Sequence, residues 1–502
     1  MKSFLTLVLF MFSAAAQAGP IVNTSYGEVE GTEGSKTLVF RGIPYALAPI
    51  GKLRWQPPQP PAKFTQVFKA QKYGAICSQE SLILHKSVGS EDCLSLNIWR
   101  PKNVSQKLPV LFWIHGGANT LGASNQQLLG SNFYDGAKLA EQGSIVVSIN
   151  YRLGALGFMA HPSLKGVNGL LGNYGILDQI AALKYVKQNI ESFGGDAENV
   201  TIFGESAGGI NVMVLMASPL AKGLFAKAIV QSGFLNDVDV QAATAQSSAL
   251  VTELGCDREQ TAECLRSKTL EQILKATRKL SAVSLVSAGA TVDGYVLKSN
   301  VLAVFESGNF ARVPLIIGTN RDEMRTLLSG FMKPKLIFLE SDYKKMLVQQ
   351  FGEEKAAKIF DYYNPRHFLN AKLALETALT DFFAHCPAKK IVRAAARTGN
   401  PVYNYVFSHV GHSPMYWQMG AGHGLEIPFV FGHMGIERTI WERQLSREMQ
   451  SYWSNFARSG NPNGSELVNW PESRSTEYLE LKTTIESKSD FRKEACEFWE
   501  NI

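Results

Sequence analysis

Short hydrophobic runs recur along the chain, and most of them end in glycine-rich or polar segments. The runs at 108–114 and 144–150 are mainly apolar, which is typical of strands that are covered on both faces of a sheet. Between 175 and 190 the apolar residues instead stand three or four positions apart, which predicts a helix. Further strand-like runs lie at 92–99, 199–205, 225–233, 313–318 and 401–408.

This order of strand, helix and strand predicts an α/β fold with a mostly parallel central sheet and helices on both faces. Residues 21–40 alternate and are broken by glycines, which favours an N-terminal antiparallel hairpin at the sheet edge. Segments 239–279 and 335–397 are rich in helix-forming residues and are expected to be helical insertions. No repeat or linker divides the chain, so we expect one domain over residues 19–502.

Residues 1–18 have the features of a secretory signal peptide. An early lysine, Lys2, precedes an apolar run from Phe4 to Phe12, and the small residues Ala16 and Ala18 favour cleavage before Gly19. A short membrane anchor is the alternative, but the run is too short to span a bilayer. No later apolar stretch is long enough either, so we expect a secreted or periplasmic protein without a membrane span.

Composition narrows the possible partners. The chain has 502 residues, of which 45% are hydrophobic and 19% are charged, as in folded globular proteins. The formal net charge of +6 is small for this length, and no dense basic cluster is present, so nucleic acid is not an expected partner. No metal-ligand cluster or dinucleotide-binding motif stands out, and no cofactor is expected.

Export makes disulfides the expected state of the six cysteines. Six cysteines can pair in many ways. Their spacing does not resemble that of a zinc or redox motif. Nearest-neighbour spacing favours the pairs Cys77 with Cys93 and Cys256 with Cys264, which leaves Cys386 with Cys496.

Candidate chemistry centres on Gly204-Glu205-Ser206-Ala207-Gly208. In the G-x-S-x-G pattern the serine occupies a cramped turn from strand to helix, and the glycines allow backbones to approach closely. A helix that begins after Ser206 would direct its free N–H groups toward negative charge that develops nearby. The pattern predicts a nucleophilic serine.

A serine nucleophile needs a base, an acid that orients the base, and N–H donors for the oxyanion. His423, Glu323 and the glycine-rich backbone after His115 meet these needs, and the order serine, acid, histidine is that of an α/β-hydrolase. Asp322 competes with Glu323 for the role of the acid. The other histidines considered for the role of base are His115, His385, His409, His412 and His433.

The chain resembles the type-B carboxylesterase family, the cholinesterase-like branch of the α/β-hydrolases. The resemblance covers almost the whole chain after residue 18 and includes the Ser206 pentapeptide and the His-Gly-Gly at 115–117. The matching segments are 40–46, 91–99, 115–117, 150–154, 178–179, 193–196, 200–209, 231–233 and 429–432.

This resemblance implies a role for each candidate residue. Ser206 would be the acyl-forming nucleophile, Glu323 the acid and His423 the base. The oxyanion would be bound by the N–H groups of Gly117, Ala118 and Ala207. The disulfides of the family agree with the pairing given above.

Two positions depart from the family pattern. Ala118 stands where glycine is usual, which keeps the N–H donor but adds a methyl group. In related esterases such a loop is associated with esters of tertiary alcohols. No tryptophan lies between Cys77 and Cys93, where cholinesterases carry a choline-binding tryptophan, and this argues against quaternary ammonium substrates.

The expected function is therefore that of a serine carboxylic-ester hydrolase acting on small-molecule esters. A lipase with a lid formed by the helical insertions is the hydrolytic alternative. A non-catalytic binding protein of the same fold is a second alternative, which the filled triad positions disfavour.

Overall fold

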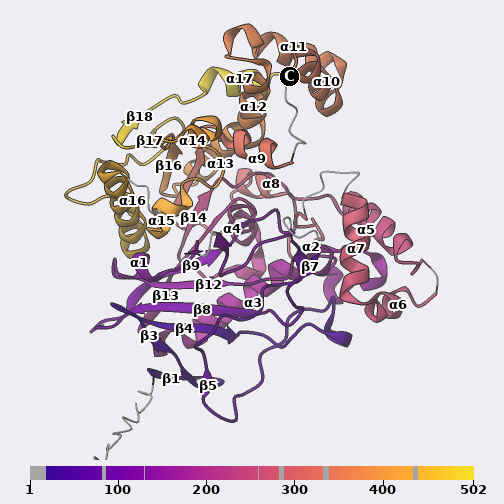
Figure 1. The fold of residues 1–502 in the computed structure, drawn as a ribbon, viewed down its shortest axis with the longest axis vertical. Helices are drawn as coiled ribbons and strands as arrows, with labels where there is room; N and C mark the ends of the chain where they lie inside the picture. The colour runs from indigo at the N-terminus through magenta and orange to yellow at the C-terminus, as the bar shows by residue number, and fades with distance from the viewer. Residues whose placement is uncertain are drawn as a thin grey trace, which may run out of the picture.

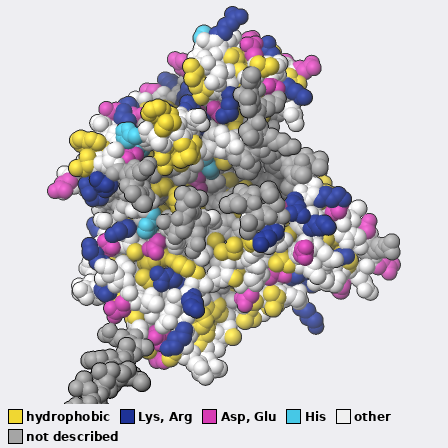
Figure 2. Space-filling view, in the orientation of Figure 1, with side chains coloured by type: hydrophobic (Ala, Val, Ile, Leu, Met, Phe, Trp, Pro, Cys, Tyr) yellow, Lys and Arg dark blue, Asp and Glu magenta, His cyan; other side chains and the backbone are white. Residues whose placement is uncertain are grey.

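A computed structural model describes residues 19–81, 86–103, 105–128, 131–257, 259–281, 288–331, 338–433 and 439–502. The predicted signal peptide, residues 1–18, lies outside the described residues. An 11-stranded sheet runs through the molecule, and helices lie on both sides of it (Figure 1). Lys, Arg, Asp and Glu side chains are intermixed over the face shown in Figure 2.

The centre of this sheet is parallel, as predicted. The seven strands that pair in parallel have the spatial order β12, β9, β13, β14, β15, β16, β17. Because parallel strands end at the same edge of a sheet, the segments that follow them meet there. Their bounds are β9 Leu108–Ile114, β12 Ile145–Ile149, β13 Gly195–Glu205, β14 Lys227–Gln231, β15 Leu315–Asn320, β16 Val402–Phe407 and β17 Tyr478–Leu481.

Antiparallel strands complete both edges. β8 (Ser95–Pro101) pairs antiparallel with β12 and with β4 (Thr37–Pro44), and β4 pairs with β3 (Thr32–Glu33). At the other edge β18 (Glu486–Lys488) pairs antiparallel with β17.

The predicted N-terminal hairpin is present, but residues 21–40 divide between two sheets. β1 (Ile21–Thr24) and β2 (Gly27–Glu30) pair antiparallel, and β5 (Phe68–Lys69) extends them into a separate three-stranded sheet. Only β3 and β4 reach the central sheet.

Alternate residues of β9 face opposite sides of the sheet. Val110, Phe112 and Ile114 pack in one hydrophobic core, whereas Leu111 and Trp113 pack in the other. This two-sided burial explains the continuous apolar run. The first core includes residues of α3 (Tyr174–Asn189), α4 (Ala207–Ala217), α8 (Val301–Glu306) and α13 (Cys386–Ala396). The second includes residues of α1 (Ala137–Ala140), α15 (Ile427–Phe431) and α16 (Ile440–Ser459).

Both expected insertions are helical, and their helices lie at the periphery of the molecule except for α13, which falls within 335–397 but packs in the first core (Figure 1). None of the described helices combines the length and hydropathy that crossing a bilayer requires. The insertion helices are α5 Val240–Glu253, α6 Thr261–Ser267, α7 Leu270–Ser281, α10 Glu340–Phe351, α11 Glu353–Tyr362 and α12 Ala371–Thr380.

The remaining helices are α2 Gly154–Phe158, α9 Glu323–Phe331, α14 Pro414–Met419 and α17 Lys493–Glu500. The remaining strands are β6 Gln79–Glu80, β7 Ser87–Val88, β10 Gln127–Leu128 and β11 Ser131–Asn132.

Three disulfides join the pairs that the cysteine spacing favours. Cys77 bonds to Cys93, Cys256 to Cys264, and Cys386 to Cys496. The last bond spans 110 residues and fixes the C-terminal helix α17 to the start of α13.

We expect removal of this long-range bond to cost more stability than removal of a short-range one. On the chain-entropy relation, replacing Cys386 and Cys496 by serine lowers the free energy of unfolding by about 5 kcal/mol. Replacing Cys256 and Cys264, which are only 8 residues apart, lowers it by about 2.5 kcal/mol. Urea denaturation of the two double variants measures both losses. A smaller loss from the 386–496 pair would contradict the prediction.

Candidate active site

Ser206 occupies a strained turn between β13 and α4. Its φ is 57° and its ψ is −124°, a conformation that residues with a Cβ rarely adopt. Its N–H donates to the carbonyl of Gln231 at 2.9 Å, which fixes the turn to the end of β14. The serine therefore lies beyond the carboxyl ends of the parallel strands.

The glycines around Ser206 permit this turn to pack closely. A Cβ atom on Gly208 would lie 2.0 Å from the carbonyl oxygen of Ile114, and one on Gly204 would lie 2.5 Å from the carbonyl carbon of Gly208. Side chains at these two positions would push α4 away from β9. The pentapeptide thus has the close backbone approach that its sequence predicts.

The loop after β9 lies against the serine. A Cβ atom on Gly116 would lie 3.0 Å from the Cβ of Ser206. Gly117 has a φ of 105° and Ala118 a φ of 55°, so the methyl group of Ala118 has not prevented the left-handed conformation. The backbone N–H groups of Gly117, Ala118 and Ala207 make no hydrogen bond to any residue that the structure describes.

A pair of buried asparagines supports this loop, and the sequence reasoning missed it. Asn119 also has a positive φ, 55°. Its side-chain oxygen accepts from Nδ2 of Asn211 on α4 at 2.9 Å and from the Tyr151 hydroxyl at 3.0 Å. The pair ties the glycine-rich loop to the helix that follows Ser206. The available signal in the sequence was Asn211, a polar residue within the otherwise apolar run that follows Ser206.

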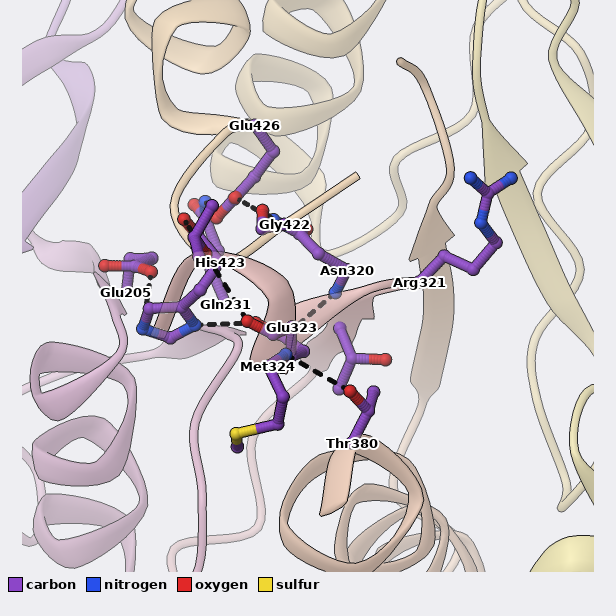
Figure 3. Close-up of polar contacts among 12 residues, drawn as sticks. Glu205, Gln231, Asn320, Arg321, Glu323, Met324, Thr380, Gly422, His423 and Glu426 are labelled. Atoms are coloured by element: carbon purple, nitrogen blue, oxygen red, sulfur yellow. Dashed lines mark hydrogen bonds and ion pairs between the residues drawn. The ribbon is translucent and has the colours of Figure 1, made fainter. Parts of the chain in front are cut away.

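His423 and Glu323 are brought together although they stand 100 residues apart. Nδ1 of His423 donates to Oε2 of Glu323 at 2.6 Å (Figure 3). The Glu323 side chain is fully buried, and its Oε1 accepts the N–H of Asn320 at 2.8 Å. Nε2 of His423 makes no hydrogen bond to a described residue. The hydrogen bond of Nδ1 thus orients the ring, and the second ring nitrogen, Nε2, faces the carboxylate of Glu205.

Asp322, the competing acid, is directed elsewhere. It pairs with Arg321 at 2.9 Å and with Arg325 at 3.5 Å, and it accepts the N–H of Ala421. Burial acts in the opposite direction, but these two arginines lower the pKa of Asp322. The geometry therefore places Glu323, and not Asp322, against His423.

The other candidate histidines make different contacts. Burial lowers the pKa of His115 to about 4, and Nδ1 of this ring lies 2.8 Å from the carbonyl of Gly116. Burial also lowers the pKa of His385 to about 3. His409 lies 3.0 Å from Glu442, and Nε2 of His433 lies 2.8 Å from the carbonyl of Asp135. The ring of His412 lies 6.4 Å from that of His409.

Two buried carboxylates near His423 were not predicted as site residues. Oε1 of Glu205 lies 3.2 Å from Nε2 of His423, and Glu426 follows His423 by three residues. Burial raises the pKa of Glu205 to about 8. Burial opposes the imidazolium, but Glu205 and Glu323 together raise the pKa of His423 to about 9. The only signal in the sequence was the position of Glu205 directly before the nucleophile.

No group of three or more His, Cys, Asp or Glu side chains is placed to bind a metal among the residues that the structure describes. The chemistry that this arrangement supports is nucleophilic attack by a serine assisted by a base, with N–H donors beside the serine.

Comparison with known proteins identifies the family. A profile of the carboxylesterase family matches residues 18–499. The chain is 38% identical over 495 residues to the para-nitrobenzyl esterase of Bacillus subtilis (strain 168), covering 94% of this chain and 97% of that protein. It is 34% identical over 549 residues to the cocaine esterase of Homo sapiens, covering 99% and 93%.

A solved structure of a PNB esterase aligns with a TM-score of 0.83 at 37% identity, covering 95% of this chain and 99% of that one. This likeness confirms the predicted α/β-hydrolase fold. The chain belongs to the carboxylesterase family and is a carboxylic ester hydrolase.

Proposed function

We propose that the enzyme works through an acyl-enzyme on Ser206, with His423 as base and Glu323 as acid. The observation that carries this proposal is the 2.6 Å hydrogen bond from His423 to Glu323, together with the position of Nε2, which lies 3.2 Å from Oε1 of Glu205, the residue directly before Ser206. A buried carboxylate on Nδ1 selects the tautomer whose Nε2 can accept a proton.

The oxyanion is bound by the N–H groups of Gly117, Ala118 and Ala207. Support comes from their free N–H groups, from the contact of the loop with Ser206, and from the position of Ala207 at the first turn of α4. Donors held by rigid backbone stabilise developing negative charge without reorganisation.

The reaction then follows from these positions. His423 takes the proton of the Ser206 hydroxyl while the serine oxygen attacks the ester carbonyl. Glu323 stabilises the imidazolium that forms. Collapse of the tetrahedral intermediate releases the alcohol, which takes the proton from His423. Water repeats the attack with His423 as base and releases the acid.

The enzyme is proposed to be exported by an 18-residue signal peptide to the periplasm or the exterior, and residues 19–502 to form one domain. The three disulfides support an oxidising compartment. Its partners are small-molecule esters. We place it among esterases rather than lipases, in line with the names of its relatives.

Hydrolysis of p-nitrophenyl esters of increasing acyl length tests this function. We expect saturable turnover of soluble short-chain esters, without a rise in rate when the substrate passes its solubility limit. A jump in activity at a lipid interface, with little turnover of soluble esters, would favour the lipase alternative. No turnover of any ester by folded protein would contradict the proposal.

Replacing Glu205 by glutamine is expected to alter the pH profile. The carboxylate of Glu205 helps to raise the pKa of His423 to about 9, and catalysis requires the neutral imidazole. Loss of that charge lowers the pKa of His423, so the acid limb of kcat/KM moves to lower pH. Glu205→Asp keeps the charge and is the matched control. An unmoved limb in Glu205→Gln would show that this carboxylate does not act on the base.

A further inference from the structure

Asn320 contacts both the acid and the segment that carries the base. It is the last residue of β15, is fully buried, and precedes Glu323 by three residues. Its backbone N–H donates to Oε1 of Glu323 at 2.8 Å. Its side-chain Nδ2 donates to the carbonyl of Gly422 at 2.7 Å and to Oε2 of Glu426 at 2.6 Å (Figure 3). Because Gly422 directly precedes His423, one side chain holds the base segment beside the acid.

The orientation of the Asn320 amide is determined by its surroundings. Nδ2 faces two acceptors, a backbone carbonyl and a carboxylate, so the reverse orientation would place oxygen against oxygen at both contacts. Oδ1 is buried and has no hydrogen-bond partner among the described residues. Burial of the unpaired Oδ1 costs free energy, whereas Nδ2 is satisfied because it bridges the two acceptors.

The bridge continues toward the nucleophile through Glu426. Oε1 of Glu426 accepts from Nε2 of Gln231 at 3.1 Å. The backbone carbonyl of Gln231 in turn accepts the N–H of Ser206 at 2.9 Å. Hydrogen bonds through Asn320, Glu426 and Gln231 therefore connect the segments that carry Glu323, His423 and Ser206.

Glu426 is suited to this position as a carboxylate. Both of its oxygens accept N–H donors, which satisfies the charged form. Burial raises the pKa of Glu426, and the hydrogen bond from Asn320 opposes that rise. The titratable groups that interact electrostatically with Glu426 are Tyr134, Glu205, Glu323, Tyr405 and His423. Without the Asn320 amide, the negative charges of Glu205 and Glu323 and the apolar surroundings favour protonation of Glu426.

We propose that Asn320 is a positioning residue of the hydrolase: its amide holds the His423 segment beside Glu323 and bridges that segment to the side chain of Glu426. This inference rests on the proposed catalytic triad. Asn320 does not touch the reacting atoms, so its loss acts on kcat and on the titration of His423 rather than on substrate binding.

The test compares Asn320→Leu, Glu426→Gln and the double variant in full pH profiles of kcat and KM on p-nitrophenyl acetate. In Asn320→Leu we expect kcat to fall about 10- to 100-fold, because small misplacements of catalytic groups are costly, and KM to change little. The acid limb moves to lower pH because a protonated Glu426 no longer favours the imidazolium. Glu426→Gln produces the same shift, and the double variant shifts no further than Glu426→Gln alone.

Asn189→Leu is the matched control. Asn189 is a buried asparagine at the end of α3 that bonds to Ser25 and Tyr185, so its loss lowers the melting temperature and leaves the pH profile unchanged. Should Asn320→Leu fail to fold, Asn320→Ser, which keeps one donor on a shorter side chain, is expected to shift the acid limb in the same direction with a smaller loss of kcat.

The proposal is overturned if folded Asn320→Leu keeps the wild-type kcat and acid limb. It is also overturned if the shifts of the two single variants add in the double variant, since Asn320 would then not act through Glu426. Absence of ester turnover in the wild type would instead contradict the proposed function, so the two failures are distinguishable.

Discussion

Ser206→Ala is expected to lower kcat by about six orders of magnitude while the protein remains folded. A serine protease that loses its nucleophile suffers a loss of this size, and what remains comes from binding and the oxyanion donors. Alanine removes only the hydroxyl, and the strained φ of 57° is already borne by a residue with a Cβ. The melting temperature should therefore stay close to that of the wild type.

The measurement is p-nitrophenol release at saturating substrate, together with a thermal melt. Ser248→Ala is the control, because Ser248 lies on α5 and its hydroxyl donates only to the carbonyl of Thr244. It should retain wild-type activity. Turnover by Ser206→Ala within tenfold of the wild type would remove this serine from the mechanism.

Gly208→Ala is expected to impair both stability and activity. The new Cβ would lie 2.0 Å from the carbonyl oxygen of Ile114, a backbone atom at the end of a fully buried strand, so α4 or β9 must shift. Overpacking of this kind typically costs about 1–3 kcal/mol or more. A shift of about 1 Å in the turn that carries Ser206 is expected to reduce kcat about 100-fold.

Gly166→Ala is the matched control for Gly208→Ala. Its backbone φ is −89°, and the nearest atom to a new Cβ belongs to the side chain of Leu170 at 3.3 Å. We expect little change in melting temperature or kcat. If Gly208→Ala behaved like this control, the close approach of α4 to β9 would not be needed for the turn.

Local patterns in the sequence predict much of this fold because burial imposes a period on the chain. The strand at 108–114 is buried on both faces, and its run of apolar residues follows directly from that. The helix at 174–189 is predicted because Ile176, Ile180, Leu183 and Val186 stand at helical spacing, and all four are buried. The division of residues 21–40 between two sheets depends on partners far away in the chain, and local alternation does not reveal it.

Site residues differ in how far the sequence can identify them. The serine turn is predictable, because the need for glycines on either side of Ser206 is local. Adjacent carboxylates are not distinguishable by sequence physics: only the contacts show that Glu323 meets His423 whereas Asp322 meets arginines. Glu426 cannot be identified from the sequence either, because its proposed role depends on a hydrogen bond to Asn320, which lies 106 residues away in the chain.

The most direct test of the proposed mechanism is intact-protein mass spectrometry after incubation with a fluorophosphonate, followed by peptide mapping of the adduct. The triad assignment predicts one adduct per chain, located on Ser206 and absent from Ser206→Ala. An adduct on another residue, or none on well-folded and active wild-type protein, would contradict the assignment of Ser206 as the nucleophile.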